Sequence, residues 1–284
     1  MRFGNRGSLS VVIGGPEPGR WYDHEAGKGG DAVALVAHLR RCTMREAYRW
    51  SLDWLGVSAR ERRRPAQRRP QRPPERPRQP SEEERRRAAL ARRIWTEAAP
   101  AAGSLVERYL ASRGLSLPAD APLRFHPTCR RGAERLPAMV ALMTDPATGE
   151  PRGVHRTFLL PDGSGKVESD AKMMLGAAGV IRLVPDEEVA ACLGIAEGIE
   201  TSLALMQRFG WTPVWAAGSA GGIASFPVLA GIEALTIFPD ADDSGASLKA
   251  ARQCAGRWRA EGREVRHIAP PAGADFADLA GRAA

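Results

Sequence analysis

The stretch ALTIFPDADDSG, residues 234–245, joins an apolar run to a dense group of carboxylates. The apolar run fits a short buried strand, and Asp240, Asp242 and Asp243 follow it closely. A single residue separates Asp240 from Asp242, so both side chains face the same side while the chain is still extended. This much negative charge at the end of a strand predicts a site for a cation.

Around this stretch, strands and helices alternate from about residue 189 onward. The expected order is strand 192–196, helix 199–209, strand 213–216, a glycine-rich loop 218–222 that opens a short helix, strand 234–238, helix 244–260 and strand 265–269. Such alternation predicts an α/β fold, with a parallel sheet flanked by helices on both faces. In these folds the reactive residues lie just beyond the carboxyl ends of the strands.

A second acidic residue, Glu197, stands directly after the strand expected at 192–196. If this strand neighbours strand 234–238, then Glu197, Asp240 and Asp242 converge at one edge of the sheet. Clustered carboxylates repel one another unless a cation lies among them, and their oxygen atoms suit Mg²⁺ or Mn²⁺. A lone Asp-x-Asp is more often a turn that caps a helix. Together with a Glu 43 residues earlier, it is a much more specific pattern.

These two segments resemble the motifs of the Toprim domain, the nucleotidyl-transfer and strand-cleavage fold of bacterial-type primases, type IA and II topoisomerases and OLD-type nucleases. Residues 195–201, Ile-Ala-Glu-Gly-Ile-Glu-Thr, resemble its Glu-Gly motif, and residues 238–245, Phe-Pro-Asp-Ala-Asp-Asp-Ser-Gly, its Asp-x-Asp motif. The resemblance covers about residues 189–280. It implies that Glu197, Asp240 and Asp242 are metal ligands and catalytic residues, with Glu197 also a general acid or base.

Three more segments resemble parts of primase-like Toprim proteins. Upstream, residues 152–158 and 165–176 resemble the part that precedes Toprim in phage and plasmid members. Cations there would hold nucleotide or template phosphates, and Arg156 and Lys172 are the residues we expect in this role. Solvated charge on a hairpin is the alternative interpretation. Downstream, Asp275 and Asp278 belong to a segment resembling the acidic one after the fourth strand, so we expect them in the same binding region.

Residues 1–57 predict a small α+β module. Its expected parts are strands 9–13 and 21–23, a helix capped by Asp31 with an apolar face of Val33, Leu35, Val36 and Leu39, and a helix 44–55 that starts with a Thr43/Glu46 capping box and buries Ala47, Tyr48, Leu52 and Leu55. The module begins close to its first strand, which leaves open that an N-terminal part of it is absent.

The segment Gly27 to Val36 resembles the end of the zinc-binding domain of bacterial primases. Tyr22, Asp23 and His24 stand where that family would place thiol ligands, so we expect no zinc here. Residues 27–30, Gly-Lys-Gly-Gly, lack the spacing of a phosphate-binding loop and predict a tight turn.

The formal charge of +8 is concentrated in one segment. Residues 58–80 contain nine Arg, six Pro and two Glu, which gives seven of the eight net positive charges. Such a composition predicts a disordered, extended tether. It is either a solvated spacer or a non-specific contact for nucleic-acid phosphates, whose strength would depend on salt.

Residues 81–188 predict helices and a hairpin ahead of the Toprim domain at 189–284. The expected elements are a helix 85–95 led by Ser81 and three glutamates, a helix 104–112 that closes on Gly114, and strands 137–144 and 152–160 around a turn at 145–149. Four dispersed cysteines without a CxxC pair indicate reduced thiols. The sequence has no long apolar run and no signal-like start, so we expect a cytoplasmic location and no contact with membranes.

The sequence thus predicts a primase-like nucleotidyltransferase, a DNA-directed RNA polymerase that joins NTPs into short primers on single-stranded DNA during replication of a phage, plasmid or other mobile element. Two alternatives remain open, a metal-dependent Toprim nuclease and a non-catalytic DNA-binding or replisome adaptor. The chain contains no GxxxxGK[ST] motif, so the resemblance implies a separate replicative helicase as a partner.

Overall fold

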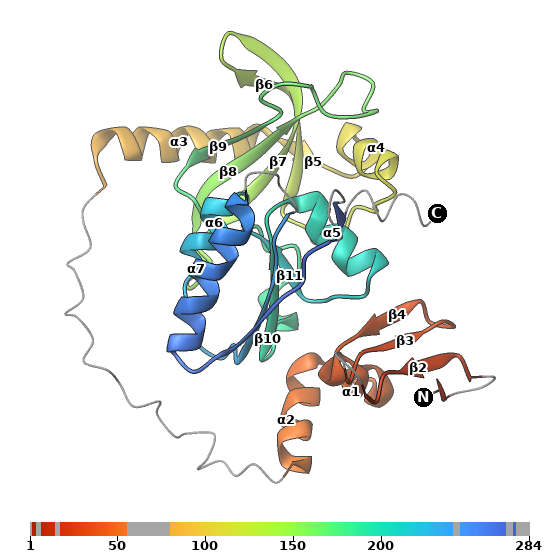
Figure 1. Cartoon of the computed structure of the whole chain (residues 1–284). Coiled ribbons are helices and arrows are strands. Elements are labelled where there is room, and N and C mark those ends of the chain that lie inside the picture. The colour runs from red at the N-terminus through yellow and green to blue at the C-terminus, as the bar shows by residue number, and fades with distance from the viewer. Residues whose placement is uncertain are drawn as a thin grey trace.

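The computed structural model of the chain describes residues 2–3, 7–14, 18–55, 80–240, 245–270 and 275–276. The expected tether, apart from Pro80, lies outside these ranges, and so do Asp242, Asp243 and Asp278. Within the described ranges the strands form three sheets, each built from one part of the chain (Figure 1).

The N-terminal part forms an antiparallel sheet with two helices. Its elements are β1 Arg2–Phe3, β2 Leu9–Val11, β3 Trp21–Asp23, β4 Lys28–Gly30, α1 Ala32–Arg40 and α2 Met44–Trp54. As predicted, Asp31 caps α1 by accepting a hydrogen bond from the Ala34 amide, and Thr43 and Glu46 form a capping box on α2. The glycines predicted to form only a tight turn instead continue into strand β4, which pairs with β3.

The predicted buried faces of these two helices are wrong at their ends. Leu39 is 61% exposed and Leu55 is 64% exposed. The physical reason is the small size of the module's core, which consists of Leu9, Trp21 and Ala34 with three partly buried neighbours. This core contains Ala34 and Leu35 of α1 and Met44 of α2, but neither Leu39 nor Leu55.

The second part is an antiparallel sheet between two helices. Its elements are α3 Glu82–Glu97, β5 Ala99–Pro100, α4 Leu105–Ser112, β6 Leu123–Arg131, β7 Glu134–Thr144, β8 Pro151–Phe158 and β9 Lys172–Gly176, with the strands in the order β5-β6-β7-β8-β9. The β7–β8 hairpin is confirmed. Sequence reasoning missed β6, which contains Pro127 and several arginines, and β9, which is short and lies at the sheet edge.

Alternate residues of β7 face opposite sides of this sheet. Ala138 and Val140 pack in one cluster with Ile94 of α3. Met139 and Ala141 pack in another cluster that contains α4. The two helices therefore cover opposite faces.

The third part confirms the predicted parallel sheet. Its elements are the 3₁₀ helix Asp186–Glu188, β10 Cys192–Ala196, α5 Ile199–Arg208, β11 Val214–Ala216, α6 Ala220–Ser225, β12 Ala234–Phe238, α7 Ala246–Ala260 and β13 Glu264–His267. The strands pair in parallel in the order β11-β10-β12-β13. Helices α6 and α7 pack on one face, and α5 lies on the other (Figure 1).

The antiparallel and parallel sheets share a core. One buried cluster unites α4 and β7 with Leu203 and Ala204 of α5, and Ile181 bridges to Ala216 of β11. This shared packing carries β8 and β9 to the carboxyl edge of the parallel sheet. Among the described helices, none combines the length and apolar character needed to cross a membrane.

Candidate functional site

The carboxyl edge of the parallel sheet brings together acidic residues that are distant in sequence. Glu197 directly follows β10, Asp240 follows β12, and the two strands are neighbours with Ala196 opposite Phe238. The Ser247 hydroxyl of α7 donates a 2.8 Å hydrogen bond to Glu197 Oε2. A cavity of about 90 Å³ opens here, lined by Tyr109, Arg113, His155, Lys166, Lys172, Glu197, Gly198, Glu200, Thr201, Gly218, Asp240 and Asp275.

Asp240 is the most electrostatically strained carboxylate of the cavity. Burial, together with the nearby Glu197 and Asp275 carboxylates, raises its pKa to about 6. Its Oδ1 atom is buried and has no hydrogen-bond partner among the described residues. A buried carboxylate oxygen without a hydrogen bond destabilises the fold, and so does the repulsion between neighbouring carboxylates. A bound cation would relieve both effects.

A buried network stands beside this carboxylate. Lys172 Nζ lies 2.9 Å from Glu200 Oε2, and the Tyr109 hydroxyl donates a 2.8 Å hydrogen bond to Glu200 Oε1. Burial would raise the pKa of Glu200, but the Lys172 charge and these hydrogen bonds lower it well below its usual value. Burial and the Glu200 charge raise the pKa of Tyr109. Glu200 is therefore a carboxylate, and Tyr109 a neutral donor.

His155 and Arg156 of β8 point to opposite sides of the antiparallel sheet. His155 lines the cavity, is 4% exposed, and its Nδ1 has no hydrogen-bond partner among the described residues. Burial and the Lys172 charge lower its pKa to about 4, so the ring is neutral at physiological pH. Arg156 instead donates to the Arg130 carbonyl on the α3 side.

The structure thus brings four of the expected site residues, Glu197, Asp240, Lys172 and Asp275, to one cavity. It does not bring Arg156 there, and Asp242 and Asp278 lie outside the described residues. Sequence reasoning missed His155, Glu200 and Tyr109 as cavity residues. Glu200 stood inside the quoted Glu-Gly motif, but only the fold shows that its side chain turns inward.

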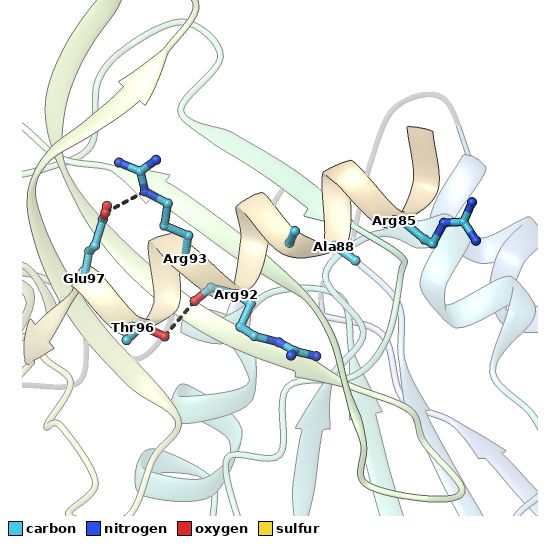
Figure 2. Close-up of a pocket in the computed structure, with 7 residues that line it drawn as sticks. Arg85, Ala88, Arg92, Arg93, Thr96 and Glu97 are labelled. Atoms are coloured by element: carbon cyan, nitrogen blue, oxygen red, sulfur yellow. Dashed lines mark hydrogen bonds and ion pairs between the residues drawn. The ribbon is translucent and has the colours of Figure 1, made fainter. Parts of the chain in front are cut away.

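A different charged surface lies along α3. A hollow lies over the exposed side of this helix, and Figure 2 shows Arg85, Arg92 and Arg93 projecting from the helix there, with Ala88 between Arg85 and Arg92. Arg93 pairs with Glu97 at 2.7 Å, and both side chains are largely exposed. These charges are solvated, whereas the charges of the cavity are largely enclosed.

Comparisons with known protein families match two parts of the chain. Residues 192–284 match the family model of the Toprim domain, and residues 85–182 match the model of a domain of unknown function, DUF7146. The chain thus carries a Toprim domain, as the motifs around Glu197 and Asp240 predict. No curated protein matches the chain.

Two solved structures are similar to the chain. One is the structure of the zinc-binding and RNA polymerase domains of the Aquifex aeolicus primase, which is 15% identical in sequence. The match covers 96% of this chain and 75% of the primase chain, with a TM-score of 0.47. The other is a DNA primase domain from Pseudomonas aeruginosa, which is 16% identical in sequence. The match covers 69% of this chain and 74% of the primase domain, with a TM-score of 0.48.

Toprim domains generally bind Mg²⁺, and the described side chains fit such an ion in part. Asp240, with its unpartnered oxygen, and Glu197 beside it could hold a divalent cation. Within the described ranges no group of three His, Cys, Asp or Glu side chains is arranged as a metal site. The expected third ligand, Asp242, lies outside those ranges.

Proposed function

We propose that this protein is a primase-like nucleotidyltransferase that joins NTPs on single-stranded DNA with Mg²⁺ or Mn²⁺. The observation that carries the proposal is the meeting of Glu197 and Asp240 at the carboxyl edge of a Toprim sheet, beside the Lys172 ammonium. The cation would neutralise phosphate charge and help to align the attacking hydroxyl. Asp242 and Asp278 belong to the proposed site by their motifs.

The residues around the carboxylates support distinct roles in this reaction. Lys172 and Asp275 line the same cavity, and we assign Lys172 to nucleotide phosphates. The cavity of about 90 Å³ is too small for a nucleoside triphosphate, so base and sugar would lie outside it. His155, neutral by its lowered pKa, offers a hydrogen bond without a charge.

Template strands need a larger cationic surface than this cavity provides. The exposed arginines of α3 supply one (Figure 2), and the arginine-rich segment 58–80 precedes it in the chain. Arg156 is only 6% exposed and lines a hollow on the α3 side of the sheet, so its proposed contact is with template phosphates that enter this hollow rather than with the nucleotide. We propose that the chain divides into domains at 1–57, 58–80, 81–188 and 189–284. We also propose that it works with a separate helicase and takes part in the replication of a mobile element.

The test is primer synthesis by the full chain with circular single-stranded DNA, labelled NTPs and Mg²⁺ or Mn²⁺, resolved on a denaturing gel. We expect short labelled products that are lost by at least about 100-fold in Glu197→Gln and Asp240→Asn, because each removes a charge that holds the cation. Asp120→Asn, at an exposed aspartate away from the cavity, is the matched control and should retain activity.

Two other results would contradict this function. Cleavage of the template without synthesis, lost in Asp240→Asn, would identify a nuclease. An intact template without labelled product would favour a non-catalytic DNA-binding adaptor, provided that the protein still binds the template.

A further inference from the structure

Glu200 is a buried carboxylate for which the proposed reaction has no use. It is 5% exposed, and its two oxygens accept hydrogen bonds from Tyr109 and Lys172. A carboxylate saturated in this way is poorly placed to coordinate a metal or to contact a substrate. Glu200 can therefore act on the cavity in two ways, by its own charge, which is felt at Asp240, and by the position in which it holds the Lys172 ammonium.

The Lys172 ammonium lies among the cavity carboxylates. A Cβ atom added at Gly198, inside the Glu-Gly motif, would be only 3.6 Å from Lys172 Nζ. Burial lowers the pKa of Lys172, but Glu200, Asp240 and Asp275 together raise it above its usual value. The group is therefore a cation in the same cavity as the carboxylates that are expected to hold a divalent metal.

We propose that Lys172 is a fixed cation of the carboxylate cavity that competes with the divalent metal, and that Glu200 and Tyr109 are the residues that position it. This inference rests on the metal site of the proposed function. A nearby ammonium reduces repulsion among the carboxylates when no metal is bound, and it weakens the metal's attraction to them. The hydrogen bonds to Glu200 keep the ammonium from moving fully onto Asp240.

Direct Mn²⁺ binding by the purified full chain tests this without nucleotide or template. Free Mn²⁺ is measured by electron paramagnetic resonance, and site binding is the portion lost in Asp240→Asn. Lys172→Met should bind Mn²⁺ about tenfold more tightly, because a positive charge is removed beside the carboxylates. Lys166→Met is the matched control. Lys166 lines the same cavity and is exposed, as Lys172 is in part, but it forms no ion pair with a carboxylate among the described residues, so we expect a change below about threefold.

The positioning role has its own readout in a charge-conserving variant. Glu200→Asp keeps the negative charge but is one methylene too short to reach both Tyr109 and Lys172. The ammonium is then free to move toward Asp240, so Mn²⁺ binding should weaken by about threefold. If Glu200 acts through Lys172, then Glu200→Asp has no further effect in the Lys172→Met background.

Three results would overturn the inference. They are absent Mn²⁺ binding by the unmutated chain, unchanged or weaker binding by Lys172→Met, and an equal effect of Glu200→Asp in both backgrounds. If Lys172→Met fails to fold because Glu200 is left without its cation, the double variant Lys172→Met/Glu200→Gln replaces it and must bind Mn²⁺ more tightly than the single variant Glu200→Gln, since these two differ only in the lysine charge. Primer synthesis plays no part in this readout, so failure of the proposed enzyme activity and failure of this inference are separable.

Discussion

Two ion pairs of similar geometry lie in very different places in this protein. Lys172 and Glu200 approach to 2.9 Å in the cavity, and Arg93 and Glu97 approach to 2.7 Å on α3. In the cavity pair the Lys172 side chain is 37% exposed and that of Glu200 only 6%, whereas the Arg93 and Glu97 side chains are 72% and 47% exposed. Distance alone therefore says little about what a charged pair does; its surroundings decide.

The difference follows from solvent. Around α3, water screens each charge and the long side chains remain mobile, so pairing adds little stability and the arginines remain available to phosphates. In the cavity Glu200 has been almost fully desolvated and must be balanced by a specific neighbour, the partly exposed Lys172 ammonium. Charge on α3 can supply affinity, while charge in the cavity can supply chemistry.

The largest expected effect tests the buried pair directly. Glu200→Ala should destabilise the chain by about 3–5 kcal/mol, because it leaves the buried Tyr109 hydroxyl without an acceptor and removes a charged hydrogen bond from Lys172. Glu97→Ala, the matched change on α3, should leave the unfolding midpoint unchanged within error. Urea unfolding followed by circular dichroism measures both. Equal effects of the two changes would break the comparison.

The sequence predicts a feature of these regions well when the residues that form it are close together in the chain. The edge carrying Glu197 and Asp240 is predictable because each residue directly follows an apolar strand, and strand order in a parallel sheet is strongly constrained. Helix caps such as Asp31 and Thr43 are predictable because they depend on residues three positions away.

The network around Glu200 could not be predicted in the same way. Tyr109 and Glu200 are 91 residues apart, and their hydrogen bond exists only because α4 and α5 pack into one core. Similarly, alternation along β8 predicts that His155 and Arg156 face opposite sides, but not which one faces the cavity. The expected segment lies at the cavity, but it is His155 and not Arg156 that lines it, and a nucleic-acid contact of Arg156 stays a prediction.

A second prediction, with a smaller expected effect on stability, concerns the buried His155 side chain and its protonation. Its pKa is about 4 in the folded chain against 6.5 for the ordinary side chain, so the unfolded chain binds more protons between these values. Folding stability from this group is therefore fully present above pH 6.5 and is lost as the pH falls toward 4. The loss amounts to about 3 kcal/mol.

The measurement compares urea unfolding of the unmutated chain and of His155→Gln at pH 7 and pH 4. The variant should lose about 3 kcal/mol less than the unmutated chain over this range, because its side chain does not titrate. If the two proteins lose the same amount of stability, the His155 ring is solvated. It would then not belong to the buried charged groups of the cavity.

The smallest expected effect concerns the exposed arginines of α3. If Arg85 and Arg92 contact template phosphates, the double variant Arg85→Gln/Arg92→Gln should weaken single-stranded DNA binding several-fold at moderate salt, whatever the sequence of the strand. The slope of log affinity against log salt should fall by about 1.4, since each lost phosphate contact on a single strand removes about 0.7. Arg93→Gln, at an arginine already paired with Glu97, should change the slope less. Fluorescence anisotropy across a salt series measures these slopes. An unchanged slope would show that solvated charge on α3 is not a nucleic-acid surface, and the template would then have to be held elsewhere on the chain.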